Sequence, residues 1–162
     1  MSTKAKTGLD GVALDAWRGF LLSHAAITRE LDADLVARHG LTSRDYEVLL
    51  FLAQEPERRL AMSELAERTM LTRSGVTRLV DGLCRIELVE RVSCSNDARV
   101  SYAQLTDQGY KRLVEAGRTH AEGIRNSFLR HFSEAETEQL AALLGRLPGA
   151  GADGTTCTVD GE

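Results

Sequence analysis

The residues with the clearest chemical potential lie on one face of a helix predicted over residues 72–86. They combine small hydroxyls with arginines, and they are Thr72, Arg73, Ser74, Thr77 and Arg78. Positions 73 and 77, like positions 74 and 78, are one helical turn apart, so these side chains share a face. An arginine can bind guanine through two hydrogen bonds, and a serine or threonine hydroxyl can reach a phosphate or a base edge. The pattern therefore predicts a helix that fits the major groove of double-stranded DNA.

A predicted β-hairpin follows this helix and carries a second set of charged side chains. Its strands are expected at 89–93 and 100–105, where β-branched and aromatic residues are frequent. Arg99 near the tip can enter a narrow minor groove, and Asp97 can hold its guanidinium in position. Arg91 at the base of the hairpin can meet a phosphate. The hairpin is thus a candidate for a second DNA contact.

Each of these features is common by itself. Exposed arginines on an amphipathic helix are usually only solvated, and an Asp-x-Arg pair in a loop is usually an exposed ion pair of little energetic value. Their order along the chain is more specific, because a short helix at 61–68, a turn, the polar helix and the hairpin follow one another. We therefore expect a winged helix-turn-helix reading head at residues 61–105.

Helices on both sides must position this reading head. Apolar residues spaced three and four apart predict a long helix over 12–38, which Gly40 ends. Thr42 then opens a shorter helix through a capping box.

On the other side of the reading head, Thr106 is suited to cap a helix over 107–131, and a capping box at 133–136 begins a last helix that Pro148 stops. The expected fold class is mainly α with a small β-wing and about six helices.

A single domain is expected over residues 12–148. A flexible N-terminus at 1–11 precedes it, and a disordered tail at 149–162, rich in glycine and threonine, follows it. Within the domain, residues 42–105 are expected to form the DNA-binding lobe. The flanking helices carry more apolar surface than one small head can bury, so we expect them to dimerise the protein, through residues 12–38 and 107–148.

Composition and motifs limit the classes of function that are possible. The net charge of −4 argues mildly against a nucleic-acid binder, yet arginines outnumber acidic residues between positions 68 and 99. Positive charge is needed only where phosphates lie. The chain carries no nucleophile-elbow, P-loop, zinc-protease or dinucleotide-binding signature, and its four histidines lack metal-ligand spacing. We therefore expect no enzyme, no cofactor and no metal site.

The cellular location can be predicted from three further features. The N-terminus lacks the apolar stretch of a signal peptide, and no apolar run is long enough to cross a membrane. The three cysteines lack the spacing of a disulfide framework. A cytoplasmic protein without membrane contact is expected.

Three segments of the reading head carry a resemblance to a known family. They are Leu71-Thr72-Arg73-Ser74-Gly75-Val76-Thr77-Arg78, Leu88-Val89-Glu90-Arg91 and Asn96-Asp97-Ala98-Arg99. Through them the chain resembles the MarR family of bacterial transcription regulators, over about residues 12–148 and most strongly over 61–109. The resemblance implies a homodimer with intertwined first and last helices. It also implies recognition helices in adjacent major grooves of a pseudo-palindromic operator, with the wings in the flanking minor grooves.

Two positions depart from the family pattern. Glu87 stands where family members usually carry glycine between the recognition helix and the first wing strand, so a residue with a Cβ must make the turn. Cys94-Ser95 replaces the usual proline-containing start of the wing loop. We expect the wing to be the part of the head that differs most from its relatives.

The resemblance also implies a switch, since family members are mostly repressors released by small phenolic or aromatic acids, or by thiol oxidation. For a ligand of this kind, Arg18 can pair with a carboxylate and His24 can bond a hydroxyl, while Trp17 and Tyr46 can pack against a ring. Simpler interpretations stay open. His24 can be a satisfied residue on an apolar stripe, and Arg18 can belong to a surface or interface ion pair.

Two rival functions remain at this point. Cys94 in the wing, with Arg91 nearby, can serve a redox-sensing repressor, whereas Cys84 on the recognition helix is expected to be a core residue. A winged-helix module that binds protein rather than DNA is the other alternative. Such a module would not need arginines at 73, 78 and 99 to face one plane.

Overall fold

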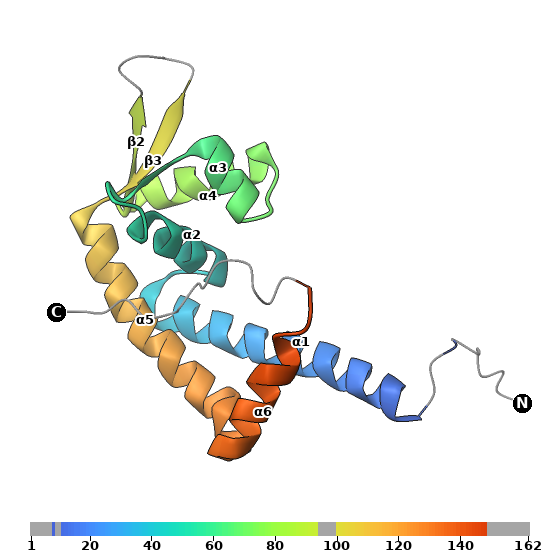
Figure 1. Ribbon diagram of the computed structural model, residues 1–162. Helices are drawn as coiled ribbons and strands as arrows, with labels where there is room; N and C mark the ends of the chain where they lie inside the picture. Colours follow the sequence, from blue (N-terminus) through green and yellow to red (C-terminus); the bar gives the residue numbers. More distant parts are fainter. Residues whose placement is uncertain (1–7, 9–10, 94–99, 149–162) are drawn as a thin grey trace, which may run out of the picture.

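The computed structural model describes residue 8, residues 11–93 and residues 100–148. Its helices and strands follow in the order α1 (Gly11–His39), α2 (Ser43–Ala53), β1 (Arg59–Ala61), α3 (Met62–Arg68), α4 (Arg73–Arg85), β2 (Val89–Ser93), β3 (Ser101–Leu105), α5 (Asp107–Ser127), the short 3-10 helix η1 (Leu129–His131) and α6 (Glu134–Leu144). The prediction of a mainly α fold with a small β-wing is confirmed (Figure 1). The predicted wing tip with Cys94, Asp97 and Arg99 lies outside the described residues, as does the predicted tail at 149–162.

The molecule consists of a head and two long arms (Figure 1). The head contains α2, α3, α4 and the sheet, and the β2–β3 hairpin projects from its edge. The arms are α1 and α5, which lie below the head, and α6 follows at the far end of α5. None of the helices in the described part of the chain is long and apolar enough to cross a membrane.

Close packing and polar contacts join the two arms. Gly123 permits the approach, because a Cβ built at this position of α5 would lie 2.5 Å from Leu31 Cδ2 of α1. Nearer the head, His39 Nε2 lies 2.7 Å from Thr119 Oγ1, and Arg112 Nη1 donates to the carbonyl oxygen of His39 at 2.8 Å. The end of α1 is therefore fixed to α5 just below the head.

The sheet has three antiparallel strands in the order β1-β3-β2. The predicted hairpin is present, with Val89 opposite Leu105 and Ser93 opposite Ser101. The outer strand β1 was not expected from the sequence. It pairs with β3 over three residues, of which only Leu60 is buried, so its sequence offers too short an apolar pattern to identify a strand.

The expected helix starts are confirmed by their caps. Thr42 and Ser133 each form a capping box with the carboxylate three residues on, and Thr106 Oγ1 accepts from the Gly109 N–H at 2.9 Å. Two hydrogen bonds from Ser133 lower the pKa of the Glu136 carboxyl. The helix predicted over 107–131 is divided instead, because Phe128 leaves helical geometry at φ −126° and η1 follows.

A junction at Leu88 connects the reading head to the arm α5. The Leu88 carbonyl accepts from the Thr106 N–H at 3.1 Å, and the neighbouring Glu87 carbonyl accepts from Thr106 Oγ1 at 2.7 Å. Gly109 is packed on the same carbonyl, since a Cβ there would overlap the Leu88 oxygen. We call these contacts the Leu88 junction; they join the end of α4, the start of β2 and the first turn of α5.

The turn between α4 and β2 has the left-handed geometry that the sequence predicted to be difficult. Glu87 has φ 60°, a region in which a Cβ is strained. The Glu87 N–H donates to the Cys84 carbonyl and the Leu88 N–H to the Leu83 carbonyl, both at 3.1 Å. This is the Schellman pattern, with Leu83 and Leu88 both buried.

Replacing Glu87 in this turn gives a direct measure of its strain. We expect Glu87→Gly to be more stable than Glu87→Ala by about 1 kcal/mol in the free energy of unfolding, because only glycine adopts this geometry without steric cost. Both variants remove the same carboxylate, so their difference isolates the backbone. Urea unfolding at one fixed protein concentration measures it, and equal stability of the two variants would contradict the strain.

Candidate nucleic-acid interface

The two faces of α4 are separated as the sequence predicted. Its apolar side is buried through Val76, Val80 and Leu83. The opposite side is exposed and carries the predicted set, which is Thr72, Arg73, Ser74, Thr77 and Arg78. The helix therefore presents hydroxyls and guanidinium groups outward from a fixed apolar base.

The first turn of α4 is held by its own hydroxyls. Thr72 is the N-cap, and its Oγ1 accepts from the Gly75 N–H at 3.1 Å and lies 3.2 Å from Ser74 Oγ. A Cβ at Gly75 would lie 3.2 Å from the same Thr72 oxygen, which is a tight contact. Thr72 thus stabilises the helix end. The N-terminus of α4, with its positive end of the helix dipole, stays at the surface, where it can attract a phosphate.

A shallow cavity of about 350 Å³ lies where α3, α4 and β3 meet. Its polar lining comes from Ser63, Arg73, Thr77 and Ser101. The cavity places two predicted residues of α4 beside the wing strand, so one surface combines the recognition helix with the start of the wing. Ser63 and Ser101 could not be predicted as members of this surface, because their proximity depends on the packing of three elements.

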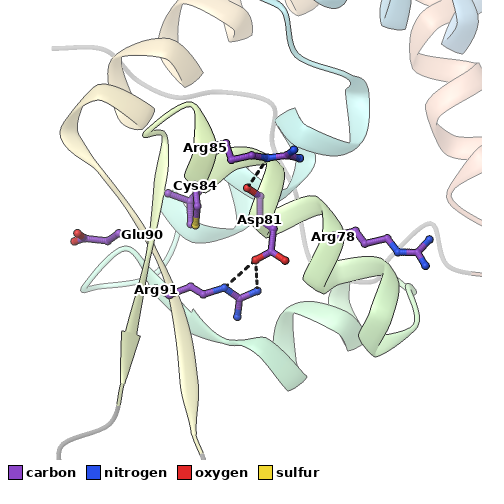
Figure 2. Close-up of a pocket in the computed structure, with 7 residues that line it drawn as sticks. Arg78, Asp81, Cys84, Arg85, Glu90 and Arg91 are labelled. Carbon is purple, nitrogen blue, oxygen red and sulfur yellow. Dashed lines mark hydrogen bonds and ion pairs between the residues drawn. The ribbon is translucent and has the colours of Figure 1, made fainter.

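A larger cleft of about 920 Å³ lies between the second half of α4 and β2 (Figure 2). Arg91 crosses it to Asp81, and the Asp81 Oδ1 atom accepts from Arg91 Nε at 3.2 Å and from Arg91 Nη2 at 2.8 Å. Arg85 Nε donates to the main-chain oxygen of the same Asp81 at 3.3 Å. Sequence reasoning selected Arg91 but missed Asp81, since two opposite charges ten positions apart do not indicate contact.

The thiol of Cys84 lines the same cleft. Cys84 is half-buried and packs against the core, as expected from its place on α4. Burial raises the pKa of its thiol, and the nearby Arg91 guanidinium offsets this only in part. A raised pKa leaves little of the nucleophilic thiolate at neutral pH.

The four predicted ligand residues do not gather in one place. The rings of Trp17, Phe20 and His24 stack in sequence along α1, with centroids 6.1 Å and 6.3 Å apart. Arg18 is exposed on the same helix. Tyr46 is instead buried in the core, where its ring lies 5.0 Å from that of His120 on α5.

An apolar groove of about 500 Å³ lies between α1 and the segment from the end of α5 to α6. Of the predicted ligand residues, only His24 lines it. The other lining side chains include three aromatic rings, those of Phe20, Phe128 and Phe132. The fold brings α1 and α6 together around this groove, so its lining could not be identified from the sequence.

Two histidines at the base of the head stay uncharged at neutral pH. Burial lowers the pKa of His120, whose Nδ1 is buried without a hydrogen-bond partner in the described part of the chain. The pKa of His39 is lowered by burial and by the neighbouring Arg38 and Arg112 guanidinium groups. A neutral ring suits each position. A charged His120 would be poorly solvated, and a charged His39 would lie beside two guanidinium groups whose effect the Glu115 carboxylate offsets only in part.

Comparison with known proteins agrees with this geometry. The sequence profile of the MarR family matches residues 39–100, which include α2, α3, α4 and β2. YetL, an HTH-type transcriptional repressor of Bacillus subtilis (strain 168), is 31% identical over 111 residues, or 68% of this chain and 66% of YetL. PecS, an HTH-type transcriptional regulator of Dickeya dadantii (strain 3937), is 30% identical over 122 residues, or 75% of this chain and 72% of PecS.

Solved structures show the same fold over most of the chain. AbsC, a MarR family transcriptional regulator from Streptomyces coelicolor, superposes with a TM-score of 0.76 and 29% identity, covering 84% of this chain and 91% of AbsC. Sco3205 from the same organism, solved in complex with DNA, gives a TM-score of 0.77 and 27% identity, covering 88% of this chain and 89% of Sco3205. With the exposed polar face of α4 beside an antiparallel wing, these matches establish that the chain belongs to the MarR family of transcriptional regulators.

Proposed function

We propose that this protein is a sequence-specific DNA-binding transcription regulator, a repressor that acts as a homodimer. The observation that carries the proposal is the outward polar face of α4, with the apolar face of the same helix buried and the wing strands beside it. The similarity to Sco3205, which was solved with DNA, supports it. YetL and the homoprotocatechuate degradative operon repressor of Escherichia coli are both named as repressors, which supports repression rather than activation.

Distinct roles follow for the residues of this surface. Arg73, Thr77 and Arg78 point outward from α4 and are proposed to read base edges in the major groove. Ser74, near the helix N-terminus, and Arg91, at the wing base, are proposed to contact phosphates.

For the wing tip we retain the proposal that Arg99 enters the minor groove with Asp97 as its support.

Exposed apolar side chains on the arms support the homodimer. Trp17 and Leu22 of α1 are 53% and 71% exposed, and Leu143 of α6 is 54% exposed. Apolar surface on this scale, gathered on the arms, is typical of an interaction surface. A two-fold dimer would bury it, and it would set two copies of α4 on one face of a DNA duplex. We propose residues 12–38 and 107–148 as the dimerisation region and 42–105 as the DNA-binding lobe.

Selection of bound duplexes from a random pool tests this function and its symmetry together. We expect enriched sequences with two inverted half-sites about one helical turn apart. Sedimentation of the free protein should give twice the mass of one chain. A winged-helix module that binds protein would enrich no sequence and would show no binding to duplex even at low salt.

A single arginine of α4 should carry a measurable share of the affinity. We expect Arg73→Gln to weaken binding to the selected duplex about tenfold or more, because a guanidinium contact to a base edge or phosphate is lost. Arg118→Gln is the matched control, since it removes the same charge from the exposed side of α5. Fluorescence anisotropy measures both variants, and equal affinities would remove Arg73 from the interface.

We further propose that a small aromatic or phenolic acid releases the protein from DNA, bound in the groove with His24, Phe20, Phe128 and Phe132. The groove offers apolar ring surface together with the His24 imidazole and the hydroxyls of Ser23 and Thr28, which suits an aromatic ring that bears polar substituents. The homoprotocatechuate degradative operon repressor, 29% identical over 110 residues, supports this class of ligand. Trp17 continues the aromatic row of α1, and Arg18 stays a proposed carboxylate partner.

Titration with homoprotocatechuate tests the effector site. We expect the acid to lower the affinity of the wild-type protein for the selected duplex, and His24→Ala to need a higher concentration of it for the same effect. Tyr46→Phe is the control, because Tyr46 is buried outside the groove. An unchanged response of Arg18→Ala would remove Arg18 from the site. If neither homoprotocatechuate nor benzoate affects wild-type binding, the effector proposal is wrong.

A further inference from the structure

The cleft between α4 and β2 holds an ion pair whose role the binding surface alone does not explain. Asp81 accepts two hydrogen bonds from Arg91 on a single oxygen, at 3.2 Å and 2.8 Å. One partner lies on the recognition helix and the other on the first wing strand. In Figure 2 the third guanidinium nitrogen of Arg91 points away from Asp81.

Stability is a poor explanation for this pair. The side chains of Asp81 and Arg91 are 55% and 34% exposed, so water screens their attraction. Exposed ion pairs contribute little to the free energy of unfolding. An acidic residue on the recognition helix also repels DNA phosphates. The Asp81 carboxylate therefore opposes DNA binding unless it also assists a residue that contacts DNA.

We propose that Asp81 is a positioning residue for DNA binding, which holds Arg91 ready for a phosphate. The proposal rests on the proposed DNA-binding function. A guanidinium carries five N–H donors in a rigid fork. Asp81 uses the edge formed by Nε and Nη2, so the donors of Nη1 remain available beside α4. Fixing the long side chain beforehand avoids its loss of rotamer freedom when DNA binds.

Arg85 extends the same arrangement. Its Nε donates to the main-chain oxygen of Asp81, which holds a second guanidinium against α4. Arg78, in contrast, makes no ion pair with any described residue and extends outward in Figure 2. Asp81 therefore organises one side of the cleft through both its carboxylate and its carbonyl. Only the carboxylate can be removed by substitution.

Two explanations for Asp81 predict opposite changes in DNA affinity when its carboxylate is removed. If Asp81 only adds negative charge near DNA, Asp81→Asn should bind more tightly. If it positions Arg91, Asp81→Asn should bind about two- to tenfold more weakly, since the side chain must then be immobilised on binding. Glu90→Gln is the matched control, because Glu90 lines the same cleft but its carboxylate points away from Arg91 in Figure 2.

The experiment uses fluorescence anisotropy with the duplex selected by the wild-type protein, over a series of KCl concentrations. We expect Arg91→Gln to reduce the slope of log affinity against log salt by about one, because a phosphate contact is lost. Asp81→Asn should lower the affinity but keep the wild-type slope, because Arg91 still reaches its phosphate, and Glu90→Gln should keep that slope as well. Asp81→Glu should restore part of the affinity. The double variant Asp81→Asn with Arg91→Gln should bind no more weakly than Arg91→Gln alone.

Other results would overturn the assignment. Asp81→Asn binding as tightly as Glu90→Gln or more tightly would show that the carboxylate only repels DNA. A loss that persists in the Arg91→Gln background, together with a lower urea midpoint, would assign Asp81 a structural role instead. A wild-type protein that binds no duplex would overturn the proposed function along with this inference.

Discussion

The geometry of this protein depends on the main-chain contacts at the Leu88 junction. One carbonyl accepts from Thr106 while Gly109 lies directly on it, and the adjacent Glu87 carbonyl accepts from the Thr106 hydroxyl. These contacts fix the angle between α4, the wing and α5. Main-chain atoms and a glycine are therefore closely packed where the reading surface meets the arm.

The arginines of this acidic chain differ in whether an acidic residue neutralises them. Several arginines away from the proposed DNA surface are paired with acids, in the pairs Arg38–Glu122, Arg44–Glu47, Arg58–Asp107, Arg59–Glu57 and Arg68–Glu55. Arg73 and Arg78 have no acidic partner among the residues that the structure describes. The guanidinium groups of Arg73 and Arg78 are therefore not neutralised by a neighbouring acid, so a net charge of −4 is compatible with local phosphate binding.

Local signals explain what could be predicted from the sequence. Thr42, Thr106 and Ser133 act within one turn of the chain, and periodic apolar residues define the buried face of α4, so these features were correctly predicted. Contacts between distant segments left no such signal. Three features depend on how complete helices and strands pack together. They are the Asp81–Arg91 pair, the placement of Tyr46 in the core and the groove around His24.

The Leu88 junction also bears on the order of folding. Its contacts, the Schellman turn and the β2–β3 pairing all connect residues between 83 and 109, so the intervening loops are short and their closure costs little entropy. The packing of α1 on α5 instead joins distant segments, such as Arg38 and Glu122, which are 84 positions apart. We expect the recognition helix and wing to reach their final angle before α1 adds to α5. Subunit assembly would then join heads that are already formed.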